Sequence, residues 1–398
     1  VQGSCVCEPD LVGASCEHSM LEGTRYMPSV DPLRGDRKTC QGDLLAASLG
    51  QDLLRDLEAL QFPDVWDAER VTVLSLNETS GFGVTLHLIS QALSVAMREG
   101  RLLVTEGKLS YFRHRACKAA DLSCYFEVPH GTCPAEVLRA SSQAEYTANY
   151  QLVHDWHVPD KFSGPGGGAF FFSAHLSRFL MTPNRRLTAL LRRVKASIGF
   201  GHPVLGVHVR HGDSCPKWED KHSHLPGAKC ESFERYLHHM REMKAQYGVS
   251  QVFVCTDDEG VIDQLNLHRD FTFIHLDFDR AVFSASDWAI ELKLIMATMD
   301  RRLVAESTIL DILLLSECDY FVGTLSSHFG ALAYELSYAD KGYHAPYISL
   351  DYPWSGSMLA PVQYYQSSSG SKTGSRELNP KRKDFTERSP IPVRPRLP

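Results

Sequence analysis

Short apolar runs alternate with longer amphipathic stretches through the second half of the chain. The runs have the length of buried strands, and they lie at Pro203–Val209, Gln251–Cys255, Phe271–Leu276 and Asp319–Val322. The stretches between them carry apolar residues at helical spacing, at Cys230–Gln246, Val304–Ser316 and Gly330–Tyr338. Strands that alternate with helices predict a parallel sheet with helices on both faces, which is the doubly wound α/β arrangement.

The first half repeats this pattern on a smaller scale. A strand is predicted at Arg70–Leu76, a helix at Val84–Glu99 and a second strand at Leu102–Thr105, and the glycine turn Gly81-Phe82-Gly83 joins the first strand to the helix. This turn could also be a plain helix cap. After a second glycine turn, at 164–168, the pattern predicts helices at Ala169–Met181 and Arg185–Ile198. The chain is therefore expected to contain two Rossmann-like α/β units.

Polar residues follow three of the predicted strands directly. The run Pro203–Val209 carries His208 near its end, and Arg210, His211 and Asp213 follow it. The run at 251–255 ends in Thr256-Asp257-Asp258. The strand at 319–322 ends in GTLSSH, which contains Ser326 and Ser327. Carboxyl ends of parallel strands meet at one edge of a sheet, so these groups are predicted to share one site. An arginine there can bind a phosphate through two donors, which favours a nucleotide or sugar-nucleotide ligand.

Four regions are predicted along the chain. Residues 1–35 read as an EGF-like remnant with a linker, and 36–200 as an N-terminal α/β domain with the glycine-rich loop. Residues 201–365 read as a Rossmann-like domain, which the resemblance described below assigns to the donor, with 36–200 on the acceptor side. Residues 366–398 form a basic, proline-rich tail that is expected to be disordered.

Composition narrows the classes of partner. The chain of 398 residues has a net charge of −7 and a pI of about 6.2, which does not indicate a nucleic-acid partner. It lacks a run of about 18 apolar residues that could span a membrane. It also lacks an initiator Met and a signal peptide, so it is expected to be a fragment or a mature form whose anchor lies elsewhere.

Eleven cysteines favour an oxidising compartment. The segment CVCEPDLVGASCE resembles the end of an EGF-like module, and Asn77-Glu78-Thr79 is a glycosylation sequon. Cys215 and Cys230 bracket a polar insertion and are expected to form a disulfide. Zinc binding is the competing interpretation, because His222 and His224 lie between them, although no CxxC spacing supports it. Cys255 and Cys318 lie in apolar contexts and are expected to be buried free thiols.

Four segments in order resemble the α1,6-fucosyltransferases, a family that includes the N-glycan core enzyme of animals and the chitin-oligosaccharide enzyme of nodulating bacteria. They are GFGVTLHLISQAL, LGVHVRHGD, VFVCTDD and ILDILLLSECDYFVGTLSSHFGALAYEL, and the similarity runs from about residue 70 to 356. The resemblance implies an inverting transferase with a GT-B-like fold that transfers fucose from GDP-fucose to a glycan, by an α1,6 linkage to the core GlcNAc of N-glycans, without a metal or other cofactor. A Golgi or secreted location follows from the same resemblance, and dimerisation is left open.

The resemblance assigns roles at matching positions. Arg210 corresponds to the arginine that binds the β-phosphate, Ser327 to a phosphate-contacting serine, and the loop of Gly81, Phe82 and Gly83 to the backbone phosphate site. His208 and Asp311 correspond to residues at the guanosine end. The neighbouring polar residues are expected to organise the site; these are Asp213, Asp257, Asp258 and Ser326.

The chain departs from the family pattern after Arg210. The family has a second arginine where His211 stands. Its catalytic base aligns with Trp218, or with Glu219 after one inserted residue, so Glu219 is the candidate base, Asp220 the second and His211 the third. A protonated His211 beside the phosphate site is instead expected to be a second phosphate donor. The C-terminal SH3-like domain and N-terminal coiled coil of the animal enzymes are absent from this sequence.

Simpler interpretations remain for several of these residues. Asp311 could cap a helix or pair with Arg302, one of Asp257 and Asp258 could cap a helix, and His328 could be an ordinary loop histidine. The chain could also be a protein O-fucosyltransferase-like enzyme, or a catalytically weakened protein that retains the nucleotide pocket. The sequence names neither the acceptor nor the oligomeric state.

Overall fold

The computed structural model describes residues 24–29, 31, 33, 41–76, 81–146, 156–212, 230–284 and 290–354, and it leaves out the side chains of residues 41–44, 76, 142–146 and 284. Several sequence predictions therefore concern residues outside the description. These are the EGF-like segment, the sequon at 77–79, the insertion with Asp213, Cys215, Glu219 and Asp220, and the tail after residue 354. No helix within the described ranges is both long and apolar enough to cross a bilayer.

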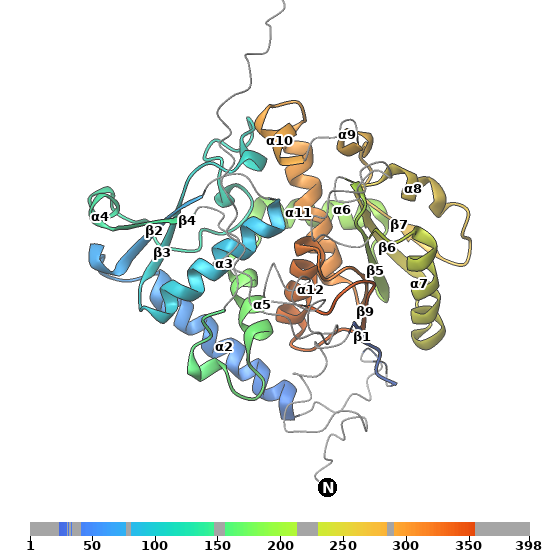
Figure 1. Ribbon diagram of the computed structural model, residues 1–398, viewed down its shortest axis with the longest axis horizontal. Coiled ribbons are helices and arrows are strands. Elements are labelled where there is room, and N and C mark those ends of the chain that lie inside the picture. Colours follow the sequence, from blue (N-terminus) through green and yellow to red (C-terminus); the bar gives the residue numbers. More distant parts are fainter. Residues whose placement is uncertain are drawn as a thin grey trace, which may run out of the picture.

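Two sheets organise the described chain, and they lie on opposite sides of the molecule in Figure 1. The smaller sheet is entirely parallel, in the order β3-β2-β4. Its strands are β2 (Val71–Leu76), β3 (Leu102–Glu106) and β4 (Ser142–Tyr146). The larger sheet has the order β1-β9-β8-β5-β6-β7 and is parallel apart from its first pair. Its strands are β1 (Arg25–Tyr26), β5 (Val204–Val209), β6 (Gln251–Thr256), β7 (Thr272–Ile274), β8 (Tyr320–Gly323) and β9 (Tyr347–Ser349).

Helices cover both sheets and fill the space between them. In Figure 1, α11 and α12 lie between the two sheets, while α7 lies on the outer side of the larger one. The α-helices are α2 (Gln41–Gln61), α3 (Phe82–Arg98), α4 (Ala135–Ala140), α5 (Ala169–Leu180), α6 (Arg185–Ile198), α7 (Phe233–Tyr247), α8 (Glu259–Leu265), α9 (Ala281–Ser284), α10 (Ile290–Ile295), α11 (Arg301–Glu317) and α12 (His328–Lys341). Short 3-10 turns include η2 (Ser110–Phe112). The sequence prediction of an α/β fold with two parallel-sheet units is confirmed.

The central strands of the larger sheet are apolar on both faces. Val252 and Val254 of β6 pack toward α7, whereas Phe253 and Cys255 pack toward α11. Successive side chains of a strand point to opposite faces, so a strand covered by helices on both sides must be apolar throughout. This requirement explains why these strands appear as continuous apolar runs in the sequence.

One apolar core joins the two units. It contains residues of α3 and α5 from the first half of the chain together with residues of α11 and α12 from the second. The helix α5 packs against both α3 and α12, and Phe170 of α5 contacts the rings of Tyr338 and Trp354. The shared core fixes the position of the glycine turn before α3 relative to the strand ends of the larger sheet.

The segment before α2 is part of the second unit rather than only a linker. β1 pairs with β9 in antiparallel register, and the amide of Ser349 donates to the carbonyl of Thr24 at 2.7 Å. The hydroxyl of Tyr320 also donates to Asp31 at 2.9 Å. Residues near the N-terminus therefore close one edge of the sheet, which the alternation of apolar and polar positions did not predict because the strand has two residues.

Candidate functional site

A cavity of about 300 Å³ lies between the two units, at the carboxyl ends of β5 and β6. Its lining comes from the turn before α3, the ends of β5 and β6, the helices α10 and α11, and the turn between β8 and α12. The lining includes nine of the residues that the sequence singled out: Gly81, Phe82, Gly83, His208, Arg210, Asp257, Asp311, Ser326 and Ser327. The structure thus brings together residues that lie up to 246 positions apart in the sequence, from Gly81 to Ser327.

Two helix N-termini face the cavity from different units. α3 begins at Phe82 with Gly81 as its N-cap, and α12 begins at His328 with Ser327 as its N-cap. The two turns touch, because a Cβ built on Gly83 would lie 2.8 Å from the backbone carbonyl oxygen of His328. Unpaired amides and the positive end of the helix dipole favour an anion at such a position. Two helix N-termini that meet at one cavity therefore favour an anionic ligand group.

Arg210 supplies a full positive charge beside these helix ends. It follows β5, lines the cavity and forms an ion pair with Asp257, which follows β6. The second oxygen of Asp257 accepts the backbone amide of His211 at 3.0 Å. Asp257 therefore holds the turn that carries Arg210. It also offsets part of the arginine charge in the ligand-free protein.

His211 and Asp258 pair with each other and do not line the cavity. The ring atom Nδ1 of His211 lies 2.8 Å from Asp258, and Nε2 lies 2.8 Å from the carbonyl oxygen of Glu231. The hydrogen bond to Asp258 raises the pKa of His211, and the same bond lowers the pKa of Asp258. Asp258 is also the N-cap of α8, accepting the amide of Gly260 at 2.9 Å, so the simpler interpretation holds for this acid. The structure does not bring His211 or Asp258 into the cavity lining, because both ring nitrogens and the carboxylate are bonded within the protein.

Asp311 lies in the middle of α11 and is 4% exposed. Its Oδ1 has no hydrogen-bond partner among the described residues. Burial raises the pKa of Asp311 to about 7, against the opposing effects of the Arg280 charge and the Cys255 thiol. The alternative pairing with Arg302 is wrong, because Arg302 bonds to Glu306 at 2.9 Å and Asp311 is far from either end of its helix. A buried carboxyl group that lines a cavity with one oxygen unpaired is a strong candidate to bind donors of a ligand.

His208 lies close to this buried end of the cavity. Its ring stacks on Phe329 with centroids 4.9 Å apart, and its Nδ1 has no partner among the described residues. Burial and the nearby Arg210 charge lower the pKa of His208 to about 3, so the ring is neutral. A neutral imidazole and a carboxyl group with one unpaired oxygen can together recognise a planar polar ligand.

The cavity also includes residues that the sequence analysis missed. Tyr111 of η2 donates to Glu291 of α10 at 3.3 Å, and burial followed by the Glu291 charge raises the pKa of Tyr111. His328, which the sequence left as an ordinary loop histidine, lines the cavity as well. Glu291 and Tyr111 lie in segments without a motif, so no sequence signal could have found them. His328 directly follows Ser326 and Ser327, and its position beside these two predicted site residues could have identified it as a cavity-lining residue.

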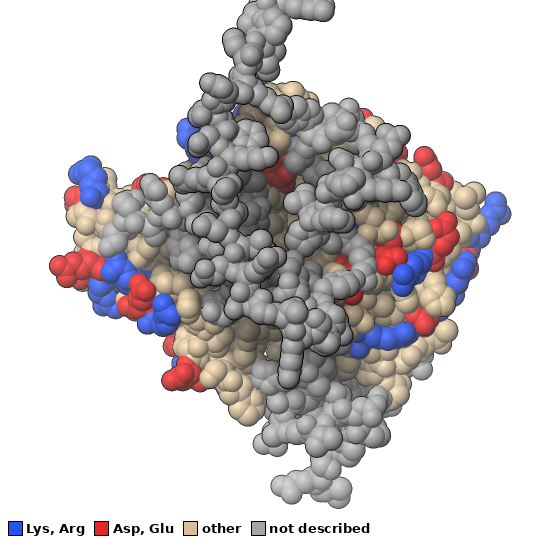
Figure 2. Space-filling view, viewed as in Figure 1, with Lys and Arg blue, Asp and Glu red and all other residues tan. Residues whose placement is uncertain are grey.

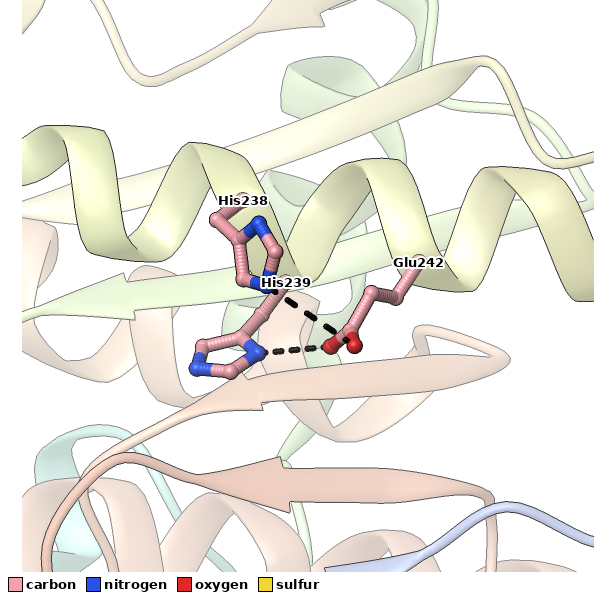
Figure 3. Close-up of side chains that lie close together, drawn as sticks. All are labelled: His238, His239 and Glu242. Carbon is pink, nitrogen blue, oxygen red and sulfur yellow. Dashed lines mark hydrogen bonds and ion pairs between the residues drawn. The ribbon is translucent and has the colours of Figure 1, made fainter.

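Arginine, histidine and backbone donors bond to the carboxylates of Asp257 and Asp258. Within the ranges the structure describes, one cluster has the composition of a metal site: His238, His239 and Glu242 of α7 (Figure 3). Glu242 lies 2.7 Å from Nδ1 of His239 but also forms an ion pair of 3.0 Å with Arg25. None of the three lines the cavity.

Cys117 and Cys124 form a disulfide, and Cys230 is also disulfide-bonded. Because Cys215 lies outside the described residues, its pairing with Cys230 stays a prediction. Cys255 and Cys318 are buried and free, as the sequence predicted. Figure 2 shows Lys and Arg side chains interspersed with Asp and Glu around the visible edge of the described surface, in keeping with the small net charge.

Comparisons with known proteins find the same family that the sequence motifs resemble. A family model of α-(1,6)-fucosyltransferase N- and catalytic domains matches residues 165–352. The α-(1,6)-fucosyltransferase of Drosophila melanogaster is 23% identical over 350 residues, which are 82% of this chain and 52% of that protein. The chain therefore spans about half the length of this curated relative.

Two groups of solved structures are also similar. The NodZ α-1,6-fucosyltransferase soaked with GDP-fucose matches 67% of this chain and 92% of its own, with 17% identity and a TM-score of 0.40. POFUT1 in complex with GDP matches 72% of this chain and 99% of its own, with 12% identity and a TM-score of 0.41. The resemblance predicted from the sequence is confirmed, since residues 165–352 match the catalytic domains of the α-(1,6)-fucosyltransferases.

Proposed function

We propose that this protein is an inverting, GT-B-like fucosyltransferase that transfers fucose from GDP-fucose to a glycan, with the core GlcNAc of N-glycans as the acceptor and an α1,6 linkage. The observation that carries the proposal is the cavity between the two units. It combines an anion-binding end, formed by Arg210 and two helix N-termini, with a buried end formed by Asp311 and His208. The match to the fucosyltransferase catalytic domains supports the choice of donor.

The two ends of the cavity fit the two ends of a guanosine diphosphate. A guanine presents two neighbouring N–H donors, which one carboxylate can accept, whereas adenine presents a different pattern. The pyrophosphate then extends toward Arg210 and the amides of the turns at 81–83 and 327–329. Ligand pockets of this kind begin at about 300 Å³, which agrees with the volume observed here.

Transfer needs stabilisation of the leaving group. As the acceptor oxygen bonds to the anomeric carbon, the bond from that carbon to the β-phosphate oxygen breaks and negative charge develops on GDP. Arg210 and the helix amides lie where they can stabilise this charge. We therefore propose that the reaction does not use a metal, and that activity survives EDTA.

The acceptor hydroxyl must lose a proton to a base as the new bond forms. Glu219 remains our candidate, with Asp220 as the second. Glu219→Gln keeps the shape of the side chain and removes the base, so it should lower turnover by about 100-fold or more, the usual range for loss of a general base. GDP affinity should stay nearly unchanged, because the proposed base contacts the acceptor.

The proposed location is the secretory pathway, with the Golgi lumen as the working compartment. The disulfide between Cys117 and Cys124 and the bonded state of Cys230 support this proposal, because disulfides persist in oxidising compartments.

The test is incubation of the purified protein with GDP-fucose, EDTA and a panel of N-glycans and folded EGF-like domains, followed by mass spectrometry. Addition of one deoxyhexose to the core GlcNAc is the expected result. Addition to an EGF-like domain would indicate a protein O-fucosyltransferase instead. GDP binding without transfer to any acceptor would contradict the proposed activity and leave a nucleotide-binding protein.

A further inference from the structure

A chain of three buried polar side chains connects the core to the cavity. Oε2 of Glu335 lies 3.0 Å from Nε2 of His87, and Nδ1 of His87 lies 2.6 Å from Nδ1 of His328. Glu335 and His328 belong to α12, whereas His87 belongs to α3 of the other unit. Glu335 is 1% exposed and His87 is 5% exposed, while His328 lines the cavity. The chain thus begins at a buried carboxyl group and ends where the proposed donor binds.

Glu335 is surrounded by hydrogen-bond donors. It accepts Nε1–H of Trp354 at 2.8 Å and the Ser177 hydroxyl at 3.1 Å, in addition to its bond with His87. Three donors to one carboxyl group favour the charged form. A charge this deeply buried also requires a compensating charge. Among the described residues bonded to Glu335, His87 alone can carry a positive charge.

A proton on both ring nitrogens of His87 would determine which nitrogen of the neutral His328 ring carries its proton. With both ring nitrogens protonated, His87 donates from Nε2 to Glu335 and from Nδ1 to His328. Nδ1 of His328 must then accept, so the single proton of the neutral His328 ring lies on Nε2. Burial and the facing His87 lower the pKa of His328 to about 3, which agrees with a neutral ring. No hydrogen bond joins Nε2 of His328 to another residue in the described part of the chain.

The position of His328 indicates what its Nε2–H can bind. His328 is the first residue of α12, next to Ser327, and its backbone touches the turn at Gly83. A hydrogen-bond donor on His328 would line the same cavity as the amides of the two helix N-termini and the Arg210 side chain. All of these groups favour a phosphate oxygen.

We propose that His328 donates a hydrogen bond from Nε2 to a phosphate oxygen of the nucleoside diphosphate donor, and that His87 and Glu335 are positioning residues that hold the ring in this form. The proposal rests on the proposed function, because it assigns a further contact in the same donor site. The opposite arrangement, with a neutral His87, would place a lone pair of His328 toward the phosphate and would weaken binding.

The first test is nitrogen-15 NMR of the ligand-free protein with labelled histidine, with His328→Gln and His87→Phe used to assign the two residues. His328 should show a protonated Nε2 and an unprotonated Nδ1, and His87 should show two protonated nitrogens. His175 provides an internal reference, because its Nδ1 lies 2.8 Å from the carbonyl oxygen of Phe171 and must carry the proton. An unprotonated Nε2 on His328 would overturn the proposal.

The second test is calorimetry with GDP. His328→Phe should weaken binding by about 10-fold or more, the range for loss of a hydrogen bond to a charged group. His87→Phe should have a similar effect, whereas His87→Asn can still donate to Nδ1 of His328 and should restore most of the affinity. His175→Phe is the matched control, since His175 is buried in the same core away from the cavity, and it should leave GDP affinity unchanged.

The outcomes separate this inference from the proposed function. If the wild-type protein transfers fucose but His328→Phe and His87→Phe bind GDP normally, the inference is wrong and the function stands. If the wild-type protein binds GDP with the expected effects of these variants but transfers no fucose, the function is wrong and the inference stands. If GDP does not bind to the wild-type protein, both are wrong.

Discussion

We expect Asp311 to lose a proton when the proposed ligand binds in the cavity. Burial raises the pKa of Asp311 to about 7, so below that pH a proton must leave before the carboxylate can accept two N–H donors of guanine. The raised pKa reflects burial, which disfavours the charged form, and ligand donors would favour it. Donor binding should therefore release a proton at pH values below about 7.

We predict that the affinity for GDP-fucose falls as the pH is lowered from 8 to 5.5, approaching about tenfold per pH unit below the pKa. GDP-fucose is the suitable ligand, because its pyrophosphate diester does not titrate in this range. Calorimetry across the range measures the slope. Asp311→Asn should bind weakly with a flat profile, and equal slopes for the two proteins would remove Asp311 from the site.

Arg210 provides a separate residue-scale prediction. Arg210→Ala should weaken GDP binding by about 10- to 100-fold, because a hydrogen bond between charged groups is worth about 1.5–3 kcal/mol. Arg241→Ala is a matched control, since Arg241 lies on the outer helix α7 and pairs with Asp270 at 3.0 Å. Isothermal titration measures both affinities. Equal GDP affinity for the two variants would contradict the assignment of Arg210.

At the scale of elements, the cavity depends on the contact between the first turns of α3 and α12. Gly83 permits this contact, because a Cβ at this position would lie 2.8 Å from the backbone of His328. Neither element can shift freely, since α3 packs in the shared core and α12 continues from β8. A larger residue at position 83 must separate the two helix N-termini.

We predict that Gly83→Ala lowers GDP affinity and reduces the free energy of unfolding by about 1–3 kcal/mol, the usual cost of overpacking. Gly164→Ala is the control, because a Cβ on Gly164 would meet no atom within 4 Å. Calorimetry and chemical denaturation measure the two effects. Wild-type affinity in Gly83→Ala would show that the contact does not position the phosphate site.

Elements with strong periodicity could be predicted from the sequence, and short or non-local elements could not. β5, β6 and α11 follow from long apolar patterns, and the structure places them within a few residues of the expected bounds. β1 and β9 are two and three residues long, too short for a periodic signal, and their pairing joins positions more than 300 residues apart. The helix α2 was not predicted from the sequence either.

The same distinction applies to the site. Several of the strand-end residues line the cavity, among them Arg210 and Asp257, because parallel strands gather their carboxyl ends at one edge, whereas His211 and Asp258 do not. Glu291 and Tyr111 enter the cavity from α10 and η2, whose positions depend on tertiary packing. His211 could not be assigned from the sequence, because its ring turns toward Asp258 and Glu231, an orientation that depends on the fold.

At the scale of the whole molecule, the two units make one site that neither could make alone. The turn before α3 comes from the first unit, whereas Arg210, Asp311 and the turn before α12 come from the second. The shared core between the units holds these groups together. We propose that this junction is a guanine nucleotide site.

The most direct test is a calorimetric comparison of GDP and ADP as ligands of the wild-type protein and of Asp311→Asn, at pH 8. The wild-type protein should bind GDP at least about 10-fold more tightly than ADP, since a carboxylate that accepts two donors discriminates by more than one hydrogen bond. Asp311→Asn should lose most of this preference. Equal affinities for GDP and ADP in the wild-type protein, or no binding of GDP, would contradict the proposal.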